Sequence, residues 1–243
     1  MINATLRSLL PAAVLVGIAM APLAGQAATA TETRSVPEFT AIAASGSVNV
    51  SVSQGPVTSV QVTADDKVLA NIETVVEAGR RGPTLQIRLK REGWGWAMNY
   101  NTGPVNVVIV TPKLTALASA GSGDIRVGAL QTPALQLSIS GSGNAWLSGL
   151  DADELGISIA GSGDVRGDGR GTRLNISIAG SGDVRLAGLR SDEVTVKIAG
   201  SGDAAVQAQK TLSVSIAGSG DVSYSGDATV KSSVAGSGTV KKR

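Results

Sequence analysis

Aspartates that recur at regular spacing are the first side chains in this sequence that could carry out chemistry. A Gly-Ser-Gly-Asp string, or a close variant, begins at Gly121 and recurs six times at intervals of 18–20 residues. Stacked carboxylates of this kind could coordinate Ca²⁺, which takes several oxygen ligands. Asn144 and Thr239 replace the aspartate in two copies, however, and arginines that could neutralise the row stand two residues after three of the others: Arg126, Arg166 and Arg185. We therefore expect the aspartates to hold turns, and we expect no metal site.

An aromatic segment at 93–101 offers a second kind of chemistry. Trp94, Trp96 and Tyr100 are three of only six aromatic residues in the chain. Flat rings on a loop suit stacking against sugars or against an apolar patch of a partner. The same rings could instead cover an open end of an aliphatic core. These three residues are the candidate ligand-binding residues, and plugging of the core is the alternative.

Basic and hydroxyl side chains form two further candidate surfaces. Arg80-Arg81 and Lys90-Arg91 flank a predicted hairpin, and residues 241–243 are all basic. They could contact an anionic polysaccharide or lipid, although charges that keep strand edges from pairing with other chains follow the same pattern. Serines at alternate positions of the predicted strands give a flat polar face, which could be a solvated surface or a broad contact for polysaccharide.

The composition excludes several classes of active site. The 243 residues include no His and no Cys, which excludes Ser-His-Asp triads, thiol nucleophiles, disulfides and thiolate zinc sites. The net charge of +2 is too small for a protein that binds nucleic acid electrostatically. We therefore expect no cofactor, no nucleic-acid partner and no catalytic residue.

The residues before each glycine string alternate between apolar and polar side chains. Aliphatic residues stand two, four and six positions before the first glycine in nearly every copy, which predicts a β-strand with one buried face. The two glycines permit positive φ and leave no Cβ to collide with a neighbouring copy. The polar fourth residue can hydrogen-bond a nearby backbone N–H and hold the turn. The expected structural turn positions are Gly121, Gly123, Asp124, Gly141, Gly143, Asn144, Gly161, Gly163, Asp164, Gly180, Gly182, Asp183, Gly200, Gly202, Asp203, Gly218, Gly220 and Asp221.

A single copy cannot bury its own apolar face, so neighbouring copies must stack. We expect an all-β protein that forms a right-handed parallel β-helix, or β-solenoid, with about seven rungs of 18–20 residues. An antiparallel β-sandwich is the alternative, because a two-glycine corner can also close a hairpin. Residues 117–243 would form the solenoid. Residues 31–116 would form a β-rich segment that caps it, with candidate strands at 47–52, 59–63, 73–77, 84–90 and 105–110 and an isolated copy of the corner at 44–48.

Residues 1–30 have the features of a signal peptide. Arg7 precedes an apolar run at 9–23, and Gly25-Gln26-Ala27 and Ala28-Thr29-Ala30 both fit a cleavage site. The run is short for a membrane span, and no later stretch is long and apolar enough to be one. We expect an exported protein without a transmembrane segment after signal removal. It would lie in the periplasm or at the surface of a Gram-negative bacterium, or be secreted from it.

The order of these features resembles one known family. The segment Ala44-Ser45-Gly46-Ser47-Val48, the segments 60–69, 85–89 and 107–112, and the serial Ser-Gly-Ser-Gly-Asp corners resemble the head GIN domain. This is a family of exported bacterial proteins that carries the label auto-transporter adhesin and is otherwise a domain of unknown function. The resemblance extends over residues 36–240 as a single domain. It implies a β-helical, extracytoplasmic protein and assigns no catalytic residue.

These observations lead to one function hypothesis and two alternatives. The export signal and the rigid repeat favour a non-catalytic, adhesin-like binding protein of the envelope or surface, with a glycan or another envelope protein as its ligand. A polysaccharide-active enzyme is one alternative, because carboxylates or basic side chains could act without His. A structural or assembly protein of the envelope is the other, because a terminal rung could pair with another chain.

Overall fold

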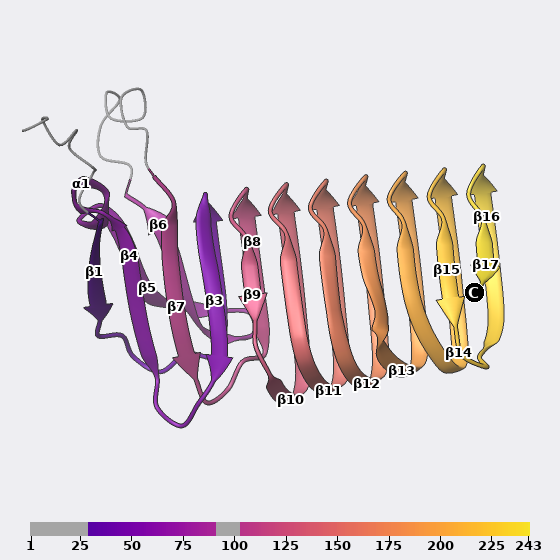
Figure 1. Ribbon diagram of the computed structural model, residues 1–243, viewed down its shortest axis with the longest axis horizontal. Coiled ribbons are helices and arrows are strands. Elements are labelled where there is room, and N and C mark those ends of the chain that lie inside the picture. Colours follow the sequence, from indigo (N-terminus) through magenta and orange to yellow (C-terminus); the bar gives the residue numbers. More distant parts are fainter. Residues whose placement is uncertain (1–28, 91–102) are drawn as a thin grey trace, which may run out of the picture.

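Parallel strands wind into a β-solenoid of about six turns in the computed structural model (Figure 1). The structure describes residues 29–90 and 103–243. All strand pairs between residues 116 and 242 are parallel, so the predicted all-β solenoid is confirmed and the antiparallel sandwich is wrong. The structure has about six turns, so the predicted count of about seven rungs is slightly too high.

Each turn of the solenoid contributes to two faces. Residues that precede a glycine corner form what we call the pre-corner face, and residues that follow it form the post-corner face. Equivalent residues stack in register, as Ile139 does on Ile159 before the corner and Ala145 does on Val165 after it. The strands of this region are β8 (Ala116–Gly121), β9 (Ile125–Val127), β10 (Leu130–Gly141), β11 (Ala145–Gly161), β12 (Val165–Gly180), β13 (Val184–Gly200), β14 (Ala204–Gly218), β15 (Val222–Ser225), β16 (Thr229–Gly236) and β17 (Val240–Lys242).

The core is aliphatic and fills the space between the two faces. Before the corner at Gly141, the side chains of Leu135, Leu137 and Ile139 are at most 2% exposed, whereas Ser138 between them is partly exposed. The apolar and polar alternation in the sequence is therefore an alternation between interior and surface. Burial of each large aliphatic side chain contributes roughly 1.5–3 kcal/mol, so stacked turns together stabilise a core that one turn could not.

The N-terminal segment supplies the remaining strands and one short helix. The candidate strands at 47–52, 59–63, 73–77, 84–90 and 105–110 coincide with β3 to β7. Asp65 caps the helix by accepting a hydrogen bond from the Lys67 N–H. The elements are β1 (Thr29–Arg34), β2 (Ala41–Gly46), β3 (Val48–Gln54), β4 (Ser59–Asp65), α1 (Asp66–Leu69), β5 (Ile72–Gly79), β6 (Gly82–Leu89) and β7 (Val105–Thr111).

Part of this segment is a rung of the solenoid itself. β2 pairs in parallel with β8, with Gly46 opposite Gly121, and β3 pairs in parallel with β9, with Ser51 opposite Arg126. The corner copy that looks isolated in the sequence is therefore continuous with the others in space. Residues 55–115 separate the two copies in the chain, and β4 to β7 lie within that insertion.

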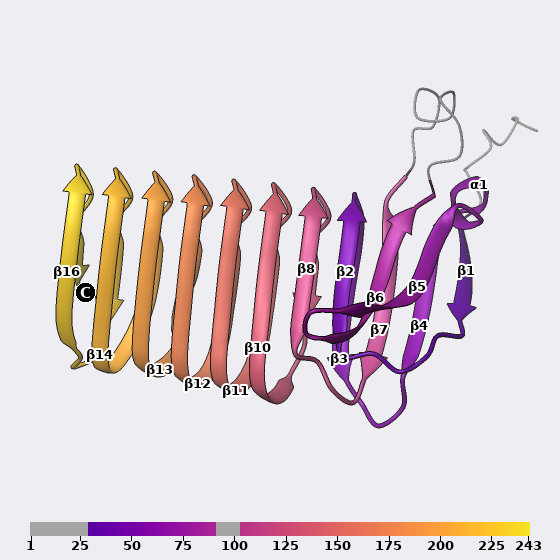
Figure 2. The ribbon, with the colours of Figure 1, turned by 180° about the vertical axis from the view of Figure 1, so that it is seen from behind.

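The outer strands of the N-terminal segment change the direction of pairing. β4 lies antiparallel between β1 and β7, whereas β6 runs parallel to β2 and antiparallel to β5. The β5–β6 hairpin leaves the sheet and crosses in front of β2 and β8 (Figure 2). Within residues 29–90 and 103–243, no helix has the length and apolar character needed to cross a membrane.

The corner glycines are required by contact between successive turns. Gly161 has φ of +133°, and a Cβ built there would lie 2.3 Å from the Gly141 carbonyl oxygen. Gly163 has no positive φ, so the expectation that both glycines supply that conformation is wrong for the second one. A Cβ at Gly163 would nevertheless lie 2.1 Å from the Gly143 carbonyl oxygen. The second glycine is needed because the backbones come too close for any side chain.

We expect Gly163→Ala to destabilise the protein by at least roughly 1–3 kcal/mol, because the backbone carbonyl that faces the new methyl group belongs to the tightly packed turn before it. Gly128→Ala is the matched control, since Gly128 has no positive φ and the nearest atom to its Cβ position is 3.6 Å away. Chemical denaturation of both variants measures the difference. Equal unfolding midpoints would contradict the packing account.

Candidate functional site

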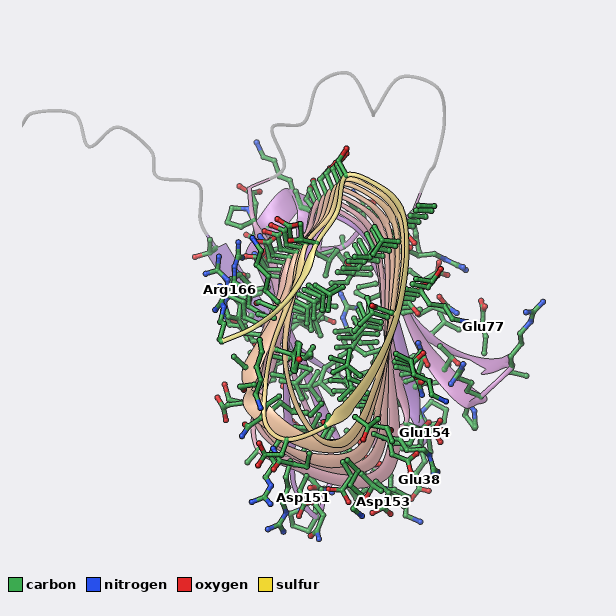
Figure 3. The ribbon with its side chains drawn as sticks, turned by 90° about the vertical axis from the view of Figure 1, so that its right-hand side faces the viewer. Glu38, Glu77, Asp151, Asp153, Glu154 and Arg166 are labelled. Atoms are coloured by element: carbon green, nitrogen blue, oxygen red, sulfur yellow. The ribbon has the colours of Figure 1, made fainter. Side chains whose placement is uncertain are left out.

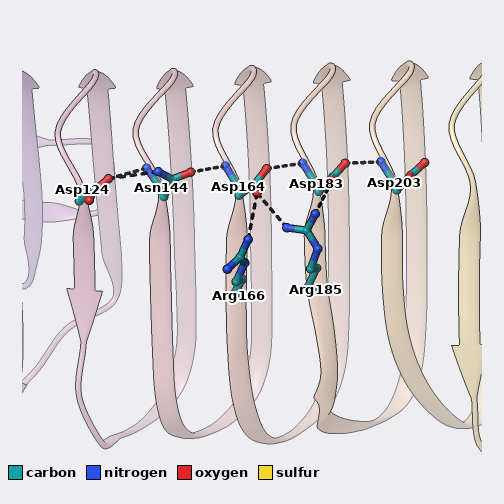
Figure 4. A network of polar contacts seen from close by, with 7 residues as sticks. All are labelled: Asp124, Asn144, Asp164, Arg166, Asp183, Arg185 and Asp203. Atoms are coloured by element: carbon teal, nitrogen blue, oxygen red, sulfur yellow. Dashed lines mark hydrogen bonds and ion pairs between the residues drawn. The ribbon is translucent and has the colours of Figure 1, made fainter.

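The polar fourth residues of the corners form a continuous ladder of hydrogen bonds along one edge of the solenoid (Figure 4). In each step a side-chain Oδ1 accepts a hydrogen bond from the backbone N–H of the equivalent residue in the next turn. We call this series the corner ladder. It runs through Asn49, Asp124, Asn144, Asp164, Asp183, Asp203, Asp221 and Thr239, with N···O distances of 2.8–3.1 Å.

The ladder connects turns to one another. The sequence led us to expect each aspartate to hold its own turn, but the N–H that it binds belongs to the neighbouring turn. This geometry explains why Asn144 fits among the aspartates, because only a side-chain oxygen is needed there. The first member, Asn49, was missed in the sequence analysis. Its signal was present, since Gly46-Ser47-Val48-Asn49 also ends in a residue with a side-chain carbonyl oxygen.

Arginines on the post-corner face neutralise part of the ladder. Arg185 donates to Oδ2 of Asp164 at 2.8 Å and to Oδ2 of Asp183 at 2.7 Å. Arg166 lies 3.6 Å from Asp164, and Arg126 lies at the same distance from Asp124. One carboxylate oxygen therefore joins the ladder while the other faces a guanidinium group.

The pKa of the Asp164 carboxyl reflects these competing contacts. Partial burial alone would raise that pKa, but hydrogen bonds from Arg185 and from the Asp183 N–H, together with the charges of Arg185 and Arg166, lower it below the ordinary value of 3.8. The pKa of Asp221 is also lowered, first by the hydrogen bond from the Thr239 hydroxyl and then by the one from the Thr239 N–H. The charged form of both residues is the form that the fold stabilises.

Beside the ladder lies a row of larger side chains, which we call the arginine–tryptophan row. Arg126, Trp146, Arg166 and Arg185 occupy equivalent positions in consecutive turns. The guanidinium carbon of Arg126 lies 4.7 Å from the centroid of the Trp146 ring, within the range of a cation–π contact. Trp146 stands where three other copies have arginine, and it is not among the candidate residues predicted from the sequence.

A hollow of about 240 Å³ borders this row. It is lined by Asn144, Ala145, Trp146, Asp164 and Arg166. These residues come from the turn of Trp146 and from the turn after it, so the hollow lies on the side of the indole away from Arg126. Trp146 therefore contacts the cation of Arg126 and also lines a hollow that contains Asp164 and Arg166.

The aromatic and basic residues that the sequence suggested as binding residues lie away from this row or outside the described residues. Trp94, Trp96, Tyr100 and Arg91 lie outside the described residues. Arg80 and Arg81 occupy the tip of the β5–β6 hairpin and line a groove over the pre-corner face. The basic residues at the C-terminus line a hollow at the last turns, together with the end of the ladder. In residues 29–90 and 103–243, no three His, Cys, Asp or Glu side chains gather in a way that could hold a metal ion.

Comparison with known proteins identifies similar chains. The family model described as "Putative auto-transporter adhesin, head GIN domain" matches residues 38–228. The crystal structure of "a putative adhesin" from Bacteroides fragilis is similar with a TM-score of 0.80 and 25% sequence identity, and the match covers 90% of this chain and 98% of that one. No curated protein matches this sequence.

Two further crystal structures share the fold at lower identity. "A putative adhesin" from Parabacteroides merdae has a TM-score of 0.68 and 23% identity, and the match covers 90% of this chain and 98% of that one. A "Putative lipid binding protein" from Parabacteroides distasonis also has a TM-score of 0.68 and 23% identity, with 88% and 96% covered. At this identity the two structures establish the shared solenoid alone.

We expect Asp164→Ala to lower the free energy of unfolding by roughly 1–3 kcal/mol, because it leaves the Asp183 N–H without its acceptor. Asp164→Asn keeps a side-chain oxygen at that place and loses only ion pairs, which are worth about 0–1 kcal/mol each at a surface. Chemical denaturation at neutral pH compares the two variants. Equal losses would show that the charge, and not the ladder bond, matters at this position.

The same pair of proteins tests the lowered pKa of Asp164. A carboxyl whose pKa is lowered in the folded state contributes stability above its unfolded pKa and loses it as the pH falls through the folded pKa. The free energy of unfolding of wild type should therefore exceed that of Asp164→Asn by its full difference above about pH 5, and this difference should decrease as the pH falls below about 4. A difference in unfolding free energy that stayed constant down to about pH 2 would contradict the lowered pKa of Asp164.

Proposed function

Because the chain belongs to the head GIN domain family, we propose that it is an exported, non-catalytic binding protein of the cell envelope or surface, adhesin-like, with a glycan or another envelope protein as its ligand. The signal-like segment 1–30 supports export to the periplasm or surface of a Gram-negative bacterium, or secretion from it. Trp94, Trp96 and Tyr100 stay candidates for additional contacts with the ligand.

The arginine–tryptophan row is the observation that carries this proposal. Its hollow is lined by Trp146 together with Asp164 and Arg166. An aromatic ring offers a flat apolar surface, and charged groups at its edge offer strong, directional hydrogen bonds. This combination suits a ligand with both apolar faces and hydroxyl or amide groups, such as a sugar ring or a segment of another protein.

The engagement of the carboxylates favours binding over catalysis. Glycoside hydrolysis needs one carboxyl group as an acid and a second as a base or nucleophile. In the corner ladder, Oδ1 of Asp164 already accepts a hydrogen bond from the next turn, and its Oδ2 faces Arg185. These two contacts hold the carboxylate in its charged form and in a fixed position, which suits a structural role better than proton transfer.

We expect Trp146→Ala to weaken binding to the ligand by roughly tenfold or more, because buried aromatic anchors dominate binding energy at most interfaces. Trp146→Phe, which keeps an aromatic face, should retain most of the affinity. The measurement is binding of the purified mature protein to fractions of the native cell envelope and to arrayed glycans. No binding by wild type to any fraction or glycan, or equal binding by Trp146→Ala, would count against the proposed site.

A further inference from the structure

The β5–β6 hairpin forms an overhang beside the solenoid. β6 joins the sheet through the pairing of Thr84–Ile87 with Ala41–Ala44 of β2 and through a hydrogen bond from the Thr40 N–H to the Pro83 carbonyl oxygen. Gly82, at the start of β6, pairs with Gly79 of β5. The tip therefore stands away from the sheet, as the view along the solenoid axis shows (Figure 3). Arg80 and Arg81 form the turn at that tip.

Below the overhang lies a groove of about 390 Å³ that spans several turns. Arg80, Arg81 and Thr84 line one side. The floor is formed by small side chains of four neighbouring strands, which stack in register from Ala43 to Ala118, Ser138 and Ser158. The floor is thus flat and carries hydroxyl groups at successive turns, about 4.8 Å apart.

The charges at the groove are unbalanced. The acidic side chains of the hairpin, Glu73 and Glu77, both pair with Arg88, at 2.8 and 3.3 Å. Within residues 29–90 and 103–243, no ion pair joins Arg80 or Arg81 to a carboxylate. Both arginines are exposed. A pair of exposed guanidinium groups without carboxylate partners favours an anionic ligand, because each can bind a carboxylate through two parallel hydrogen bonds.

We propose that this groove binds an acidic polysaccharide, with its carboxylate groups on Arg80 and Arg81 and its sugar hydroxyls on Ser138 and Ser158. The inference rests on the proposed function, because it names a ligand class for the same envelope protein at a second surface. The floor favours a sugar over a lipid, since the large apolar residues that border it, Ile42 and Leu117, are buried in the core and leave little surface to hold an acyl chain. It also favours a sugar over an added peptide strand, because the strands of the floor already pair with neighbours on both sides.

Calorimetric titration with a hexamer of galacturonate tests the proposal. The full mature chain should bind the hexamer, and Arg80→Gln/Arg81→Gln should weaken binding by at least about tenfold, because both bidentate ion pairs are lost. Arg190→Gln/Lys231→Gln removes the same charge at two exposed residues that do not line the groove and should leave the affinity unchanged. Ser158→Gln, which fills the floor without altering charge, should also weaken binding.

Two further ligands separate this inference from its competitors. The methyl ester of the hexamer keeps the rings but loses the charge, so it should bind at least about tenfold more weakly. Equal binding of the hexamer by wild type and Arg80→Gln/Arg81→Gln would overturn the proposal. So would binding to vesicles of phosphatidylglycerol that depends on these arginines, without binding to the hexamer. If wild type binds envelope fractions through Trp146 but not the hexamer, this inference fails and the proposed function stands. If wild type binds neither the envelope fractions nor the hexamer, the result contradicts both the proposed function and this inference.

Discussion

Contact between successive glycine corners is the constraint on which the rest of the structure depends. The second glycine of every corner from Gly123 to Gly220 is buried and leaves no room for a Cβ against a backbone carbonyl of the turn before it, as Gly163 does against Gly143. This approach brings the backbone N–H of Asp164 within 3.1 Å of Oδ1 of Asn144. The glycines permit the contact and the ladder fixes it, so every turn has one position and one rotation relative to its neighbours.

Because the stacking is fixed, residues at equivalent positions of successive turns form a row along the surface. The exposed position after the corner becomes the arginine–tryptophan row, and the serines before the corner become the floor of the hairpin groove. Most rows are built from small or mutually neutralised side chains. Two places that differ are an indole at Trp146 and two exposed arginines at the tip of an inserted hairpin, and these two places are where we assign ligand contacts.

The sequence alone predicted the repeat region well because its signals are local. Alternation identified the strands, and the spacing of the glycines identified the stacking. The corner-like segment that ends at Asn49 is visible in the sequence, but its position next to Asp124 is not, because the two residues are 75 apart in the chain. The sequence could not place Arg80 and Arg81 over Ser138, because the path of a hairpin off a sheet depends on tertiary packing. The role of Trp146 was visible only once its row was aligned, and residues 94–100 lie outside the described residues.

Amide hydrogen exchange at the corners tests the central claim most directly. The backbone N–H groups of Asn144, Asp164, Asp183 and Asp203 belong to partly exposed or exposed residues, yet each donates to the turn before it. If the ladder locks the turns together, these amides exchange many times more slowly than unstructured peptide, and only through cooperative opening. Exchange at the rates of unstructured peptide would contradict the account.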